Sequence, residues 1–157
     1  MGKRDHQLAG LRTIDTFFIA LFRRIELPLA RGALFFVYFY FGLLKVIGPS
    51  PANPLVKELL EKTLPGISFE QFIVFFGILE MIIGFLFLIK GAERVAIILL
   101  FFHMGTTVMP LVLLPQVAWQ SFMVPTLEGQ YMLKNILIIA LAIVIGATIK
   151  PSSSRAS

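Results

Sequence analysis

The stretch Phe72–Ile89 reads FIVFFGILEMIIGFLFLI, and Glu80 is its only charged residue. A helix needs about 20 mostly apolar residues to cross a hydrocarbon core of roughly 30 Å. A soluble chain of 157 residues has too little interior to bury helices of this kind on all sides. The stretch therefore predicts a transmembrane helix.

The rest of the chain has a similar character. Its residues are 57% hydrophobic and 15% charged, against roughly 45–50% and about 25% in an average soluble domain. We therefore expect an all-α integral membrane protein, a bundle of four transmembrane helices surrounded by lipid. The predicted spans are Leu29–Gly48, Phe72–Ile89, Val95–Leu114 and Tyr131–Ile149.

The orientation of the bundle follows from its basic residues, because cytoplasmic segments are enriched in Lys and Arg. The N-terminal flank, the connection between the second and third spans, and the tail carry ten of them: Lys3, Arg4, Arg12, Arg23, Arg24, Arg31, Lys90, Arg94, Lys150 and Arg155. The other two connections hold only Lys57 and Lys62, beside four glutamates. This predicts a cytoplasmic N-terminus over 1–28, a bundle over 29–149 and a cytoplasmic tail over 150–157, in a bacterial inner membrane.

Two amphipathic helices are expected outside the spans. In Leu8–Leu27, apolar residues recur at helical spacing and charged residues take the other side, which is typical of a helix lying on a membrane surface. We expect Pro28 to end it. A signal peptide is the alternative, but the apolar stretch Phe17–Phe22 is too short for one. A second, shorter helix is predicted from Asn53, as N-cap, to Pro65-Gly66 on the outer side.

The outer connections carry two further signals. Ser68 and Gln71 fit a capping box at the start of the second span. The segment Pro115–Gln130 contains Trp119 and Phe122, which favours an interfacial loop anchored by aromatic side chains.

Composition excludes several kinds of chemistry. Without cysteine the chain has no disulfide, no thiolate nucleophile and no Cys-ligated iron–sulfur cluster. Two histidines, His6 and His103, argue against a haem or metal site built from this chain alone. The basic residues lie at the ends and in one loop, without interleaved aromatics, which argues against nucleic acid as a partner.

Ionisable residues inside the spans are the first place to look for function, because each is costly in the membrane. Glu80 and His103 lie near mid-span, and Lys45 and Lys134 lie about one turn below the outer surface. Each span has one polar or small-residue face, and these faces are expected to meet. We predict a polar pocket that opens outward, lined by Tyr38, Lys45, Glu80, His103, Thr106, Thr107, Lys134 and Asn135.

Structural roles are the alternatives for the same residues. Lys45 would extend toward the outer head groups or form an ion pair with Glu80. His103 would hydrogen-bond a neighbouring helix, and Lys134 would be an ordinary interfacial lysine. Pro110 would kink the third span.

Several motifs resemble those of DoxX-like membrane proteins. They are Gly42-Leu43-Leu44-Lys45 followed by proline, Phe76–Glu80 continuing into Ile83-Gly84, the run Thr106–Val112, Trp119, and Leu133-Lys134-Asn135. Within that family, the pattern most resembles small membrane proteins linked to reactive-chlorine resistance. The resemblance implies a four-helix bundle and a link to redox biology, since the family takes its name from a subunit of a thiosulfate:quinone oxidoreductase. The chain departs from a redox enzyme in having no ligands for a redox cofactor.

Three functions follow as hypotheses, and whether the chain is an enzyme stays open among them. The first is a membrane subunit of a redox or oxidative-stress system that binds quinone or another small hydrophobic ligand in the polar pocket. The second is a scaffold or assembly factor for a partner membrane or redox protein. The third, a proton-coupled transporter or channel, is the least favoured because the sequence shows no inverted repeat. Gly77 and Gly84 share one face of the second span, which predicts that another helix can approach closely there. Association of several copies of the chain through such glycine faces is compatible with each of the three functions.

Overall fold

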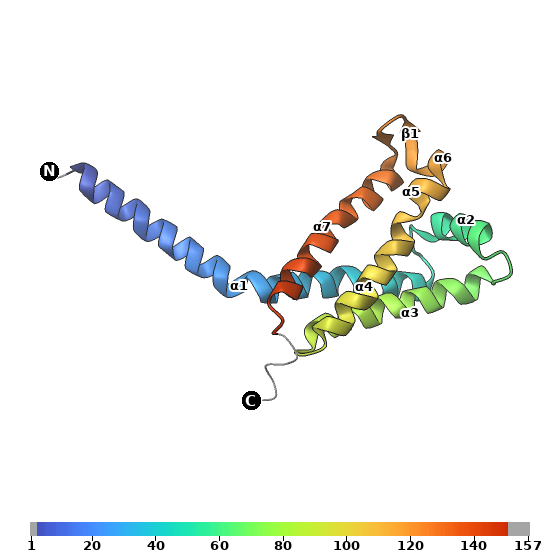
Figure 1. The fold of residues 1–157 in the computed structure, drawn as a ribbon, viewed down its shortest axis with the longest axis horizontal. Helices are drawn as coiled ribbons and strands as arrows, with labels where there is room; N and C mark the ends of the chain where they lie inside the picture. The colour runs from blue at the N-terminus through green and yellow to red at the C-terminus, as the bar shows by residue number, and fades with distance from the viewer. Residues whose placement is uncertain (1–2, 151–157) are drawn as a thin grey trace.

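The structure, a computed structural model, describes residues 3–150 and consists mainly of helices (Figure 1). Its elements are α1 Lys3–Ile47, α2 Asn53–Thr63, α3 Phe69–Leu88, α4 Glu93–Val108, α5 Pro110–Leu113, α6 Pro115–Ala118, β1 Trp119–Ser121, β2 Val124–Pro125 and α7 Leu127–Ala147. Residues 151–157 of the predicted tail, Arg155 among them, lie outside the described residues.

Four segments are long and apolar enough to cross a membrane: Ile14–Ile47, Phe69–Leu88, Glu93–Leu113 and Leu127–Ala147. The last three have 20 or 21 residues, which gives about 30 Å at ~1.5 Å per residue. This matches the thickness of the hydrocarbon core. The prediction of four helices able to span a membrane is confirmed, and each predicted span overlaps one of these segments.

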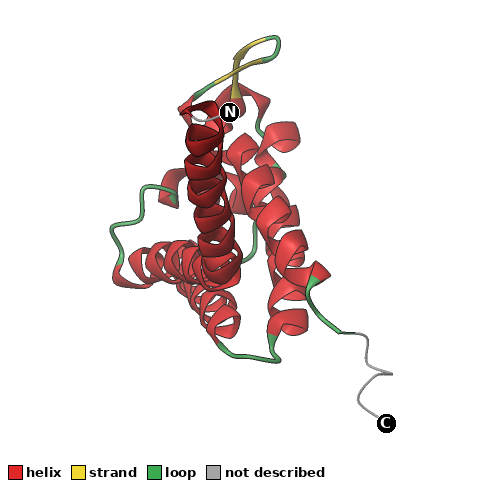
Figure 2. Ribbon diagram, turned by 90° about the vertical axis from the view of Figure 1, so that its left-hand side faces the viewer, coloured by secondary structure: helices red, strands yellow, loops and turns green. Residues whose placement is uncertain are grey.

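The first helix differs from the prediction. α1 is a single helix of 45 residues with Pro28 inside it, so the prediction that Pro28 ends a separate helix was wrong. Proline removes one backbone N–H and usually kinks a helix, but the helix continues on both sides of Pro28. The part of α1 before the bundle extends away from it, and α1 changes direction where it joins the bundle (Figures 1 and 2).

Three glycines bring α1 and α3 into close contact. A Cβ added to Gly77 would lie 2.6 Å from the carbonyl oxygen of Gly42, and one added to Gly84 would lie 2.9 Å from the backbone nitrogen of Phe39. Both distances are too short for any side chain. The prediction that Gly77 and Gly84 permit a close helix approach is confirmed, and Gly42 provides the matching surface on α1.

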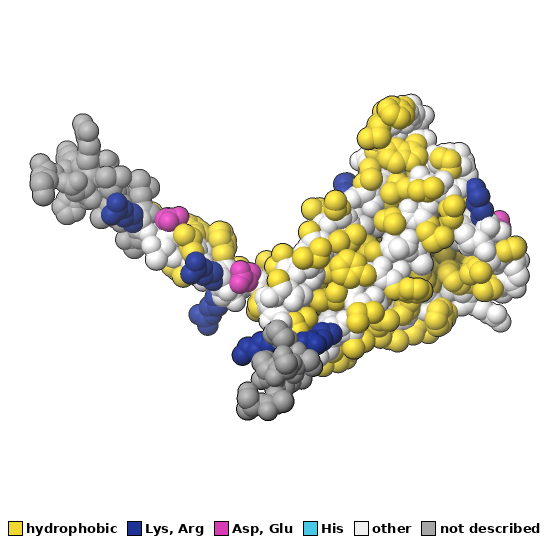
Figure 3. Space-filling view, in the orientation of Figure 1, with side chains coloured by type: hydrophobic (Ala, Val, Ile, Leu, Met, Phe, Trp, Pro, Cys, Tyr) yellow, Lys and Arg dark blue, Asp and Glu magenta, His cyan; other side chains and the backbone are white. Residues whose placement is uncertain are grey.

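The bundle core contains side chains from all four long helices. Leu34, Ile83, Phe87, Leu100 and Ile145 are each at most 1% exposed. Outside the core, the face of the bundle in Figure 3 is largely hydrophobic, and charged side chains gather on the α1 extension and near the ends of the bundle. This distribution suits contact with lipid around the middle of the bundle.

One end of the bundle, which we call the α2 end, holds α2, α5, α6 and a small hairpin (Figure 1). Pro110 interrupts the third span, so that α4 ends at Val108 and α5 begins at Pro110, as the sequence indicated. The antiparallel β1–β2 hairpin was not predicted. Its turn has Met123 at φ 61° and contains no glycine, asparagine or proline from which a turn could have been predicted.

The predicted caps were wrong in detail. The N-cap of α2 is Ala52 rather than Asn53, and the Asn53 side chain donates from Nδ2 to the carbonyl oxygen of Gly48 at 3.0 Å. Ser68 is the N-cap of α3 but makes no capping hydrogen bond. Its hydroxyl donates to Glu70 Oε2 at 2.7 Å, so Ser68 and Gln71 do not form a capping box.

Candidate functional site

A cluster of ionisable side chains lies between α1, α3 and α4. Lys45 Nζ donates to Glu80 Oε2 at 2.7 Å, and the distance between Glu80 Oε1 and His103 Nε2 is 2.9 Å. With Tyr38, which contacts the far side of the imidazole, these residues form what we call the polar cluster. The four residues are between 3% and 6% exposed, so they are almost fully enclosed by the protein.

The glycine contact explains why Lys45 reaches Glu80. Gly77 lies nearly one turn before Glu80 on α3, and a Cβ at Gly77 would be 2.9 Å from the Cβ of Lys45. The stem of Lys45 therefore occupies the space that a side chain at position 77 would fill. Its ammonium group is held beside the carboxylate instead of extending to the membrane surface.

Aromatic rings hold the imidazole of His103 in place. The Phe76 ring stacks on it with the ring centroids 4.8 Å apart, and the Tyr38 ring meets it edge-on at 5.3 Å. The hydroxyls of Thr106 and Thr107 both donate to the His103 carbonyl oxygen, at 2.7 and 3.0 Å. These contacts fix both the ring and the backbone of His103.

The hydrogen bonds determine the tautomer of His103. Glu80 accepts from the Lys45 ammonium as a carboxylate, and a carboxylate has no proton to donate. Nε2 of His103 therefore carries a hydrogen and donates it to Glu80 Oε1. The Tyr38 hydroxyl lies 3.5 Å from Nδ1, beyond the usual range of about 2.5–3.0 Å for a hydroxyl donor. The outer side of the imidazole is thus only loosely paired.

The structure brings together six of the eight predicted site residues: Tyr38, Lys45, Glu80, His103, Thr106 and Thr107. The alternative in which Lys45 pairs with Glu80 is confirmed.

Lys134 and Asn135 are not part of this group. Lys134 is exposed, and its Nζ lies 5.3 Å from the centroid of the Tyr131 ring. Asn135 is half-buried, and within residues 3–150 neither side chain hydrogen-bonds to the polar cluster. The position of Lys134 matches the alternative of an ordinary interfacial lysine.

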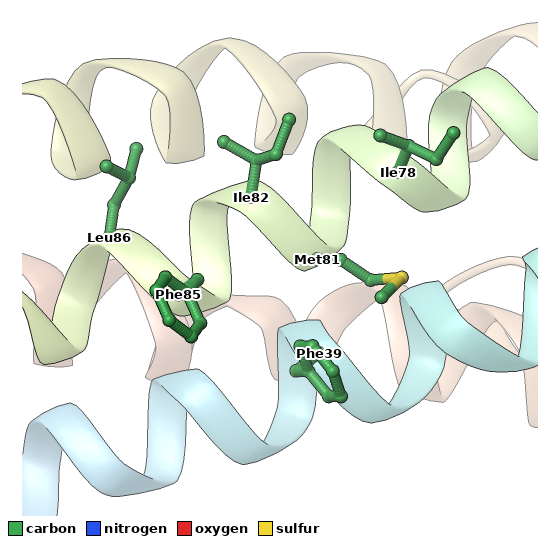
Figure 4. Close-up of a pocket in the computed structure, with 6 residues that line it drawn as sticks. All are labelled: Phe39, Ile78, Met81, Ile82, Phe85 and Leu86. Carbon is green, nitrogen blue, oxygen red and sulfur yellow. The ribbon is translucent and has the colours of Figure 1, made fainter.

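Open volume occurs on a different surface. A groove of about 310 Å³ between α1 and α3 is lined by Phe39, Ile78, Met81, Ile82, Phe85 and Leu86 (Figure 4). All six side chains are apolar, and the groove shares no residue with the polar cluster. The outward-opening polar pocket stays a prediction, and here the polar cluster is closed by its own contacts.

A second, partly buried ion pair was missed. At the end of the bundle opposite α2, Arg31 of α1 pairs with Glu93 at the start of α4. The backbone N–H of Gly91 donates to the other Glu93 oxygen at 2.7 Å. The signal was present in the sequence, because Arg31, Tyr38 and Lys45 recur at seven-residue intervals on one face of α1. Two ion pairs therefore connect α1 to the rest of the bundle: Arg31–Glu93 at the end opposite α2, and Lys45–Glu80 nearer the α2 end.

The chemistry available to the polar cluster is proton exchange and hydrogen bonding. A carboxylate within 2.9 Å of an imidazole is the kind of arrangement that general acid–base sites use. Within residues 3–150, no group of three or more His, Asp or Glu side chains is placed to hold a metal ion.

Comparison with known proteins adds no relative. No family model, no curated protein and no solved structure matches the chain. The likeness to DoxX-like proteins therefore depends on the motifs in the sequence, of which Gly42–Lys45 and Gly77–Glu80 form the contact between α1 and α3.

Proposed function

We propose that the chain is a DoxX-like membrane subunit of a redox or oxidative-stress system, and that it binds quinone or another small hydrophobic ligand at the polar cluster. The observation that carries the proposal is the hydrogen-bonded series Lys45–Glu80–His103 within three membrane-length helices. Ionisable groups inside membrane spans are costly and usually functional. The redox part of the proposal rests on the motif resemblance.

The residues of the cluster suit a quinone. Its carbonyl oxygens accept hydrogen bonds and its ring stacks on aromatic side chains, and it brings two-electron redox chemistry when bound. On the protein side, the Tyr38 hydroxyl is a donor without a close partner, and the Phe76 ring lies beside His103. Because the cluster residues are almost fully buried, binding requires Tyr38 and His103 to move apart.

The membrane orientation belongs to the same proposal. We place the α2 end of the bundle on the outer side of a bacterial inner membrane and both termini in the cytoplasm, because Lys and Arg are concentrated at the opposite end. The α1 extension before the bundle exposes Phe17, Phe18 and Phe22 along with Arg23 and Arg24. This combination is typical of a helix lying in the membrane interface.

Ligand binding tests the proposal directly. The purified protein in detergent is titrated with a short-chain quinone, and the dissociation constant is measured for wild type and Glu80→Gln. We expect at least about tenfold weaker binding for Glu80→Gln, which corresponds to the loss of roughly 1.4 kcal/mol. Glu70→Gln, an exposed carboxylate on the same helix, is the matched control and should bind like wild type. Equal affinities for all three proteins, or none for wild type, would rule the proposal out.

A scaffold or assembly factor is the second candidate, and one observation favours it. The Lys45–Glu80 pair is buried and internally satisfied, as a purely structural pair would be. Buried ion pairs are often replaceable by apolar residues at little cost. A Lys45→Met/Glu80→Leu double variant that still protects a deletion strain against an oxidant would favour the scaffold. Loss of protection with a normally folded variant would favour ligand binding.

A further inference from the structure

The β1–β2 hairpin is a small apolar projection at the α2 end of the bundle, between α6 and α7 (Figure 1). Trp119 pairs with Pro125, and Ser121 pairs with Val124. No charged residue occurs from 116 to 127. A connection in water would normally carry charged residues, so the lack of charge in this segment requires an explanation.

The base of the hairpin is firmly held. Pro115 lacks an N–H and leaves the carbonyl of Leu111 free, and Trp119 Nε1 donates to that carbonyl at 2.9 Å. The Thr126 hydroxyl donates to the Val117 carbonyl at 2.6 Å and accepts from the Gly129 N–H at 3.0 Å. The hairpin therefore has a fixed position relative to α6 and α7.

The tip, in contrast, makes little contact with the protein. Phe122 is 94% exposed and Met123 is 72% exposed. Met123 also has a left-handed backbone, φ 61°, which is uncommon for any residue except glycine. A well-anchored base and a strained turn together present two large apolar side chains outward.

The height of the tip follows from the helix that comes next. α7 starts at Leu127, directly after the hairpin, and its 21 residues span about 30 Å, the thickness of the hydrocarbon core. A helix of this length that crosses the membrane places the hairpin level with the membrane boundary. Leu127 and Tyr131, in the first turns of α7, are 61% and 62% exposed, so the apolar tip continues an apolar surface that faces lipid.

We propose that the hairpin tip, Phe122 and Met123, inserts into the lipid leaflet at the α2 end and fixes the depth of the bundle there. The occupant of this surface is lipid rather than a protein, because two side chains supply far less than the ~1,000 Å² of a specific protein interface. Uncharged aromatic and thioether side chains also suit the membrane interface. The proposal does not depend on ligand binding by the polar cluster.

Single cysteines test this insertion, since the chain has none of its own. Phe122→Cys is labelled with the fluorophore NBD and reconstituted into phosphatidylcholine vesicles. Glu61→Cys, at an exposed charged position on α2, reports water at the same end of the bundle. Ile136→Cys, 67% exposed on α7, reports the membrane interior. We expect the label at 122 to emit at shorter wavelength than the label at 61 and to be quenched several-fold less by iodide.

Lipids carrying a nitroxide then measure depth. A nitroxide near the head group should quench the label at 122 more strongly than one deep in the acyl chains, whereas the label at 136 should show the reverse. In unlabelled protein, the single Trp119 should likewise be quenched by shallow nitroxides. Emission and iodide quenching at 122 equal to those at 61 would overturn the proposal, because the tip would then face water and be available to a protein partner.

Discussion

Lys45 and Glu80 depend on each other at the level of single residues. Each is a charge buried inside a membrane-length helix, and each is compensated by the other at 2.7 Å. Removing one partner leaves a buried charge without compensation, which is worse than removing both. The pair therefore couples α1, which carries Lys45, to α3, which carries Glu80, more strongly than a single contact between two side chains would suggest.

A comparison of two lysines tests this coupling. We expect Lys45→Met to lower the free energy of unfolding by about 3–5 kcal/mol, because Glu80 loses its counter-ion. Lys45→Met/Glu80→Leu should recover more than half of that loss. Lys134→Met, at an exposed lysine, should change stability by less than roughly 0.5 kcal/mol. Unfolding in mixed detergent measures all three, and equal effects at positions 45 and 134 would show that the pair is not stabilising.

The imidazole of His103 gives a second test at this scale. The contact with Glu80 assigns a hydrogen to Nε2. With His6→Gln, His103 is the only histidine in the chain, and ¹⁵N NMR then reads its tautomer directly. We expect a protonated Nε2. A hydrogen on Nδ1 alone would contradict the assignment.

At the scale of helices, the contact between α1 and α3 positions the site. The sequence was enough to predict that α3 makes a close helix contact, because Gly77, Glu80 and Gly84 fall on one face of α3. The sequence was not enough to predict the partner of Lys45, since a lysine near a helix end can equally well extend to the membrane surface. The close approach of Gly42 to Gly77 favours the ion pair with Glu80 over extension to the surface, and that contact depends on tertiary packing.

Two other elements were missed for local reasons. Proline stops most helices, but a helix can continue through it at the cost of one hydrogen bond, and α1 does so at Pro28. The β1–β2 hairpin has Met123 where glycine or asparagine usually signals a turn. Its position depends on the Trp119–Leu111 hydrogen bond, which no sequence pattern shows.

Glycine variants test the α1–α3 contact. Gly77→Ala should destabilise the protein by about 1–3 kcal/mol, because the new methyl group would meet the Gly42 carbonyl. Gly105→Ala, in α4 with open space around it, should be neutral or stabilising, since alanine favours helix. Thermal unfolding followed by circular dichroism distinguishes the two. A stable Gly77→Ala protein with unchanged quinone affinity would show that the close contact is not needed.

For the whole molecule, the proposed orientation makes a separate prediction. In intact bacteria, a membrane-impermeant maleimide should label Glu61→Cys, at the α2 end, but should label Lys90→Cys only after the cells are opened. Both positions are exposed and charged, so reactivity differs only through the membrane. The reverse pattern would invert the bundle and place the polar cluster nearer the cytoplasmic half.

The central claim is that a hydrophobic ligand binds at the polar cluster and not in the apolar groove of Figure 4. The most direct test is photo-crosslinking of the purified protein with a photoreactive quinone analogue, followed by mass spectrometry of the modified peptides. We predict adducts on Tyr38, Phe76 and His103 that disappear in Glu80→Gln and persist in Glu70→Gln. Adducts confined to Phe39, Met81 and Phe85, unchanged by Glu80→Gln, would contradict the claim.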